Sequence, residues 1–206
     1  MPDDADAQCS AGIVARRVVL IALALLGLVV GPAAAATIAV GVSRHADGIR
    51  IEASALLRTD VATAWRVLTD YERYVEFIPD LRMSRVVARR DRMVTVQQSG
   101  DATLWVLRLP LDITFEIAEF PPFRLQSRAV AGSLRALEST YLLTQEASGV
   151  RLDYTGRVAT GFELFGPIEQ YAVERNIARQ FQALADAIEQ RRDAGNGEAP
   201  DVAGSR

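Results

Sequence analysis

Apolar and polar residues alternate along the chain with a period that changes from two to that of a helix and back. Residues 48–58 alternate, which is typical of a strand with one buried face. Asp60 is a suitable N-cap, because its carboxylate can accept a hydrogen bond from the first turn of a helix. The apolar residues that follow it share one helical face: Val61, Ala64, Trp65 and Leu68. A second short helix is predicted over residues 71–77 and ends before Pro79.

The stretch from Arg82 to about Thr160 returns to a period of two and is predicted to consist of strands and turns. Turn-forming pairs such as Gly100-Asp101 and Pro121-Pro122 divide it. The six predicted strands are 82–91, 92–100, 102–117, 123–131, 134–146 and 150–160.

The last predicted element is a long amphipathic helix that starts after Gly166-Pro167 and runs to about Arg191. The element order is therefore a strand, two short helices, six strands and a long helix. A curved antiparallel sheet of seven strands cannot bury its inner face by itself, and the long helix can cover it. The sequence thus predicts an α+β fold in which the sheet wraps around the C-terminal helix. We expect room for a ligand between the two layers.

The first 36 residues have the pattern of a secretory signal peptide. Arg16 and Arg17 precede the uncharged apolar run Val18–Val30, which Gly31-Pro32 ends before a series of small alanines. This run is shorter than the roughly 20 apolar residues that a transmembrane helix needs. We expect cleavage near Ala36 and a periplasmic or secreted protein. An N-terminal segment that is not cleaved and anchors the chain is the alternative.

The remaining chain is long enough for one domain, which we expect at residues 37–192, followed by a disordered tail at 193–206. Its composition excludes several kinds of chemistry. Cys9 is the only cysteine and would leave with the signal peptide, and His45 is the only histidine. The full chain has a formal net charge of −3 and no long charged run. We therefore expect no thiol or histidine catalysis, no metal, no cofactor and no nucleic-acid partner.

Several segments resemble one branch of the START-like (SRPBCC) superfamily, the polyketide cyclase/dehydrase and coenzyme Q-binding proteins. The most specific segment is Leu68-Thr-Asp-Tyr-Glu-Arg-Tyr-Val-Glu-Phe-Ile-Pro-Asp-Leu81, followed by Ser84-Arg-Val. The weaker matches are Phe120-Pro-Pro, Gly132, Tyr141-x-Leu143, Gly149-Val and Leu152-x-Tyr154. The resemblance covers about residues 48–190. It implies a helix-grip fold and a hydrophobic ligand such as a lipid, quinone or polyketide, and it does not fix the activity.

The long helix supplies one set of candidate ligand contacts. Its apolar stripe, which should pack on the sheet, consists of Ile177, Phe181, Leu184 and Ile188. Extended toward the N-terminus, the stripe passes through Glu174 and Gln170. We expect these two side chains to bind the polar end of an apolar ligand. The alternative is that this half of the helix projects past the sheet into solvent, because an unpaired buried carboxylate is costly.

The strands supply a second set, an apolar and aromatic wall. Alternation assigns the side chains on one face of each of four predicted strands inward: Trp105, Leu107 and Leu109; Phe123 and Leu125; Tyr141 and Leu143; and Leu152 and Tyr154. The tyrosines are the strongest candidates, because a buried hydroxyl needs a partner. The alternative for each residue, as for Phe181 on the helix, is packing in a core without a ligand.

Three functions are compatible with these features. The first is a non-enzymatic carrier of an apolar molecule, for which exchange of the ligand at a membrane is an option. The second is a cyclase or aromatase in which Glu174 and Tyr154 would move protons. The export signal argues against it, because polyketide tailoring normally takes place in the cytoplasm. The third is an envelope interaction module with a closed cavity. We assign no catalytic residue and favour the carrier.

Overall fold

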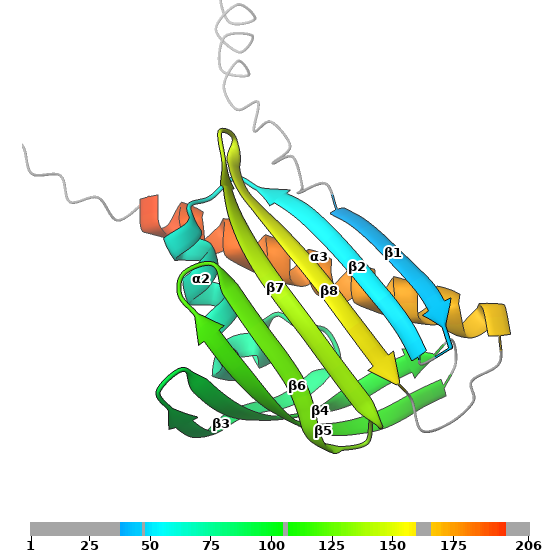
Figure 1. Cartoon of the computed structure of the whole chain (residues 1–206). Coiled ribbons are helices and arrows are strands. Elements are labelled where there is room, and N and C mark those ends of the chain that lie inside the picture. Colours follow the sequence, from blue (N-terminus) through cyan, green and yellow to red (C-terminus); the bar gives the residue numbers. More distant parts are fainter. Residues whose placement is uncertain (1–37, 47, 105–106, 160–165, 197–206) are drawn as a thin grey trace, which may run out of the picture. The chain divides into compact units, whose positions relative to one another are not determined.

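The computed structural model describes residues 38–46, 48–104, 107–159 and 166–196. Eight strands and a long helix dominate it (Figure 1). The elements are β1 (Ile38–His45), β2 (Gly48–Leu57), α2 (Val61–Thr69), the 3-10 helix η1 (Tyr71–Glu76), β3 (Leu81–Arg90), β4 (Met93–Leu104), β5 (Leu107–Phe120), β6 (Arg124–Gly132), β7 (Ala136–Glu146), β8 (Gly149–Ala159) and α3 (Gly166–Asn196).

All neighbouring strands are antiparallel, in the order β1-β2-β8-β7-β6-β5-β4-β3. The chain leaves β2, passes through α2 and η1, and returns to the sheet at its far edge in β3. It then winds back strand by strand until β8 pairs with β2. Figure 1 shows α3 running along one face of the sheet, behind β1, β2, β8 and β7. This is the predicted helix-grip arrangement.

The predicted strand count was one too low. Ile38–His45 forms β1, which pairs along its whole length with β2. The predicted domain began with this segment, but its alternation was not recognised as a strand. Ile38, Val40 and Val42 are the partly buried positions, and the residues between them are alanine, glycine and serine. Small side chains give a weak contrast between the two faces, so the period-two pattern is easy to miss.

The first helices agree closely with the sequence prediction. Asp60 caps α2: its Oδ1 accepts from the backbone N–H of Thr63 at 2.8 Å, and its Oδ2 accepts from the Thr63 hydroxyl at 2.8 Å. These hydrogen bonds hold the pKa of the Asp60 carboxyl below its ordinary value. The second helix is a 3-10 helix, whose Tyr74 hydroxyl donates to the carbonyl of Leu68 at 2.7 Å.

One predicted turn is wrong. Gly100-Asp101 does not separate two strands, because β4 continues through it to Leu104 and pairs with β5 throughout. The glycine has a different purpose: a Cβ at Gly100 would lie 2.5 Å from the carbonyl oxygen of Asp80. The missing side chain allows the backbone before β3 to approach β4, whereas the sequence alone suggested a chain reversal.

The long helix has the predicted apolar stripe and ends later than expected. Phe181, Leu184 and Ile188 are buried, and Ile177 is partly buried. The helix continues to Asn196, so it includes the first residues of the predicted tail. Ion pairs tie α3 to the segment between β2 and β3: Arg179 with Asp80, and Arg191 with Asp70 at 3.8 Å.

Candidate functional site

The helix-facing side of the sheet is tightly closed at one end. At the start of β8 and the end of β2, Val150, Leu152 and Leu57 have no solvent exposure. The C-terminal half of α3 covers them, and Ile188 on this half is also fully buried. Residues packed in this way form an ordinary core and leave no room for a ligand.

Exposure increases along the same side toward the N-terminal half of α3. In β7 the inward side chains change from buried Leu143 to partly exposed Tyr141, Ser139 and Leu137. The other elements show the same change. The partly exposed inward residues include Val158 in β8, Ser127 in β6, Phe115 in β5, and Val173 and Ile177 in α3. The layers therefore pack less closely at this end, which we call the open half of the interior.

Three aromatic rings lie where the closed half meets the open half. Tyr141 and Tyr154 are directly opposite each other on β7 and β8, with ring centroids 4.8 Å apart. Tyr154 also contacts Phe181 of α3, at 6.5 Å between centroids. The rings bridge the two layers and form an aromatic end wall for the open half.

A glycine fixes the position of one of these rings. A Cβ built on Gly156 would lie 2.5 Å from Oη and 2.9 Å from Cζ of Tyr154. The phenol of Tyr154 therefore lies against the bare backbone two residues further along β8. Burial raises the pKa of Tyr154 to about 12, and a hydrogen bond with Ser139 partly opposes this shift.

Other hydroxyl groups surround the end wall. Ser127 and Ser139 face each other across β6 and β7, with their oxygens 2.7 Å apart. Burial raises the pKa of Tyr141 well above its ordinary value, and the neighbouring phenols of Tyr154 and Tyr74 add to the shift. Among the residues that the structure describes, the Tyr141 hydroxyl has no hydrogen-bond partner. It is thus the polar group of the end wall whose hydrogen-bonding capacity is not used within the described residues.

The one carboxylate on this side of β5 is already occupied. Glu119 accepts from the hydroxyl of Tyr71 at 2.9 Å and from Arg89 at 3.1 Å through both of its oxygens. Tyr71 is buried, and its pKa is raised by burial and by the charge of Glu119. This network fastens η1 to the sheet, which is a structural role.

The predicted ligand residues are brought together only in part. Tyr141, Tyr154 and Phe181 form the end wall. Glu174 is partly exposed and lies one helical turn beyond Ile177, at the N-terminal end of the observed stripe. Trp105 lies outside the described residues, and Leu107 and Gln170 are described only by their places in β5 and α3.

Phe123 is not on the inward face to which it was assigned. It lies in the turn before β6 and is 50% exposed, while Leu125 is buried as expected. Alternation holds only within a strand, and the strand begins one residue later than predicted. Ser127, Ser139 and Gly156 were not predicted as site residues. The same alternation would have placed the two serines inward, but a single serine carries little signal.

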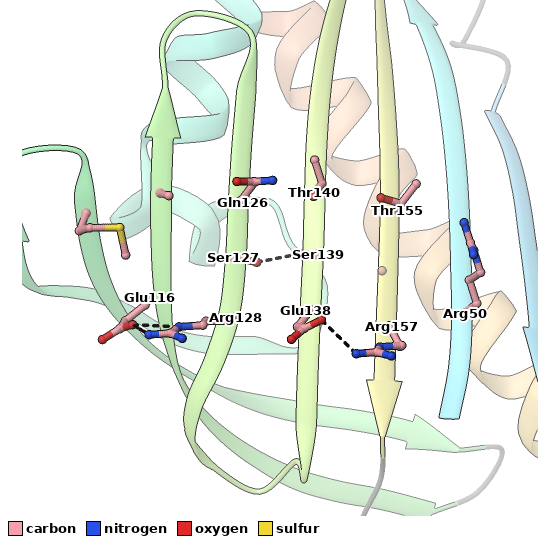
Figure 2. A pocket seen from close by; sticks show the side chains of 13 residues that line it. Arg50, Glu116, Gln126, Ser127, Arg128, Glu138, Ser139, Thr140, Thr155 and Arg157 are labelled. Atoms are coloured by element: carbon pink, nitrogen blue, oxygen red, sulfur yellow. Dashed lines mark hydrogen bonds and ion pairs between the residues drawn. The ribbon is translucent and has the colours of Figure 1, made fainter. Parts of the chain in front are cut away.

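A separate open pocket of about 490 Å³ lies on the opposite face of the sheet (Figure 2). Its walls are mainly polar side chains that alternate with the inward residues of β6, β7 and β8, and the inward positions Ser127, Ser139 and Gly156 also contribute to its lining. Glu116 pairs with Arg128 at 2.6 Å, and Glu138 pairs with Arg157 at 3.2 Å. Figure 2 shows these pairs side by side across the strands. Because the charges satisfy one another, this surface is suited to solvent rather than to an apolar molecule.

The described residues contain neither a cluster of metal-binding side chains nor a helix with the length and apolar character needed to cross a membrane. Residues 58–185, more than half of the chain, match the sequence profile of the polyketide cyclase/dehydrase and lipid transport proteins. The chain belongs to this family. No curated protein matches the sequence.

Solved structures with the fold of this polyketide cyclase/dehydrase and lipid transport family are similar over most of the chain. One is a STAR-related lipid transfer protein from Xanthomonas axonopodis, with a TM-score of 0.62, 14% identity, and coverage of 77% of this chain and 96% of that protein. Another is the Zhui aromatase/cyclase from a Streptomyces species, with a TM-score of 0.61, 13% identity, and coverage of 74% of this chain and 98% of that protein. A third is a Thermus thermophilus protein, with a TM-score of 0.60, 16% identity, and coverage of 71% of this chain and 98% of that protein. At these identities the likeness shows the fold alone.

Proposed function

We propose that the protein binds an apolar small molecule between the sheet and the N-terminal half of α3. The observation that carries this proposal is the change in exposure along one continuous surface, from a sealed core to the open half. A domain without a ligand would gain by packing both halves equally well. Membership of a family that includes lipid transport supports the same function.

Each inward residue then has a role. Tyr141, Tyr154 and Phe181 form the end wall against which the apolar part of the ligand rests. Trp105 and Leu107 remain proposed ligand contacts on the basis of the sequence pattern alone. Glu174 and Gln170 are proposed to lie near the entrance, where the ligand meets solvent.

An aromatase or cyclase activity is the second candidate, because the family includes polyketide cyclases and a similar fold occurs in an aromatase/cyclase. The tyrosines argue against it. Proton transfer is most efficient when the pKa of the catalytic group lies near the working pH. Burial moves the pKa of Tyr154 to about 12 and that of Tyr141 also upward, away from neutral pH. These hydroxyls are better suited to hold a ligand than to ionise.

We further propose that the protein acts outside the inner membrane after removal of residues 1–36. The charged start and apolar run of this segment support export. Since β1 begins at Ile38, cleavage after Ala36 would leave the whole sheet in the mature protein. Amino-terminal sequencing of the protein from the periplasmic fraction tests this. A chain that starts at Met1 in the membrane fraction would instead favour an uncleaved anchor.

The binding function is tested on protein purified from its native host under mild conditions. Native mass spectrometry should show an added mass at a ratio of about one per chain, and an organic extract should contain an apolar molecule. Protein that carries nothing and binds no apolar probe would contradict the proposal and favour an interaction module with a closed interior.

Two neighbouring residues of β7 provide matched variants. Leu137 faces the open half, opposite Val158, whereas Glu138 faces the other side and pairs with Arg157. Leu137→Trp should fill the open half and reduce the amount of bound molecule severalfold. Glu138→Trp adds the same side chain to the outer face, and this variant should keep the full amount of bound molecule. If both variants keep the same amount of bound molecule, the ligand does not bind in the open half.

A further inference from the structure

We infer that the bound molecule is uncharged, with a hydroxyl or carbonyl as its polar group, and that the interior discriminates against carboxylates such as free fatty acids. This inference rests on the proposed binding function and specifies its ligand. It follows from which polar groups face the open half and from which charges do not.

The polar side chains of β6, β7 and β8 next to the end wall are hydroxyls. On α3, Asn176 has a buried Oδ1 without a hydrogen-bond partner in the described part of the chain, and this amide is also uncharged. Ser127 and Ser139 face each other at 2.7 Å, and Tyr154 lies beside Ser139. Tyr141 has no partner among the described residues. Each hydroxyl can donate one hydrogen bond and accept others. Such a group can complement a ligand carbonyl or a ligand hydroxyl equally well.

Cations are absent from the middle of this surface. On the helix-facing side of β4 to β8, Glu119 is the only charged residue at a described position, and Tyr71 and Arg89 already bond to it. The two arginines on this side, Arg44 and Arg89, lie in the edge strands β1 and β3. Both are exposed and both have interaction partners. The chain contains no lysine.

On the described part of α3, the charged residue in line with the inward stripe is also negative. Glu174 continues the inward stripe of α3 one turn beyond Ile177. A ligand carboxylate held against the end wall would therefore lose its water, find no cation and approach a second carboxylate. Transfer of an unpaired carboxylate out of water is far more costly than transfer of a hydroxyl or a carbonyl that forms a hydrogen bond.

Three probes with the same rings separate these cases: 4-phenylphenol, biphenyl-4-carboxylate and methyl biphenyl-4-carboxylate. At about pH 7 the phenol is neutral and the acid is ionised, because their groups titrate near 10 and near 4. Calorimetric titration of the host-purified protein, after its bound molecule has been removed on a hydrophobic resin, should show binding of the phenol and of the ester. The acid should bind at least about tenfold more weakly, which corresponds to about 1.4 kcal/mol.

The outcomes distinguish a failure of the binding function from a failure of the neutral-ligand inference. If none of the three probes binds, the proposed binding function itself is contradicted. If the acid binds as tightly as its ester, the protein still binds apolar molecules, but the inference of a neutral ligand is wrong.

The free hydroxyl in the end wall provides a second, independent test. Tyr141→Phe keeps the ring and removes the hydroxyl, so the affinity for 4-phenylphenol should fall severalfold while that for unsubstituted biphenyl stays the same. Tyr171 of α3 is 64% exposed, and Tyr171→Phe is the matched control that should change neither affinity. Equal affinity of the Tyr141→Phe variant and the unaltered protein for the phenol would contradict a role of this hydroxyl in recognition.

Discussion

Gly156→Ala should destabilise the protein although alanine normally suits a strand better than glycine. The added Cβ would lie 2.5 Å from the Oη of Tyr154, so the phenol must move by roughly 1 Å to reach an ordinary contact distance. That movement is opposed by the ring of Tyr141 at 4.8 Å and by Phe181 at 6.5 Å. Overpacking of this kind costs about 1–3 kcal/mol, against a gain of about 0.5–1 kcal/mol from replacing a strand glycine.

The net expectation is a loss of up to about 2.5 kcal/mol in the free energy of unfolding, measured by urea denaturation. Gly41 in β1 is the matched control, because nothing lies within 4 Å of a Cβ built there. Gly41→Ala should be neutral or stabilising. Adding Tyr154→Phe to Gly156→Ala removes the closest atom and should recover part of the loss. If Gly156→Ala is as stable as Gly41→Ala, the phenol does not rest on Gly156 and the account of the end wall is wrong.

Three further substitutions test the contacts around the site, each by urea denaturation. Asp60→Ala removes the cap of α2 and should cost about 1 kcal/mol near neutral pH. Because the folded protein lowers the pKa of Asp60, this difference should disappear as the pH falls through that pKa, whereas a pH-independent difference would contradict a charged cap. Tyr71→Phe takes a donor from Glu119 and should cost about 1.5–3 kcal/mol; no loss would mean that Arg89 alone satisfies the carboxylate. Glu138→Gln breaks an exposed pair with Arg157 and should cost less than about 1 kcal/mol; a larger loss would give the outer face a structural role.

The order of elements and the helices were predictable because they depend on local chemistry. Asp60 and the apolar positions after it specify α2 without information from elsewhere. The stripe on α3 follows from helical spacing, and its burial is confirmed at Phe181, Leu184 and Ile188. Patterns of this kind are repeated over several turns, so one ambiguous residue does not remove them.

Features that depend on contacts distant in sequence were not predictable. Gly100 resembles a turn residue in the sequence, but it is needed because the backbone of Asp80 lies against it. The need for glycine at position 156 likewise becomes evident only when the rotamer of Tyr154 is known, because the phenol lies where a Cβ would be. The change from a sealed to an open interior depends on how closely α3 approaches each strand. Alternation assigns a face to Tyr141 or Ser139 but contains no information about that distance.

The order of the strands also has a consequence for how the chain folds. The sheet closes at the pairing of β2 with β8, where Ser54 bonds to Asp153, 99 residues away in the sequence. During synthesis from the N-terminus, the β1–β2 hairpin can form first. The other edge of β2 then has no partner strand until β8 has been synthesised. Every other pairing joins strands that are consecutive in the chain. We therefore expect the β2–β8 pairing, between the second and third strands of the sheet, to form last. A chain that stops before β8 should be left with two sets of strands that do not pair with each other, β1–β2 and β3–β7.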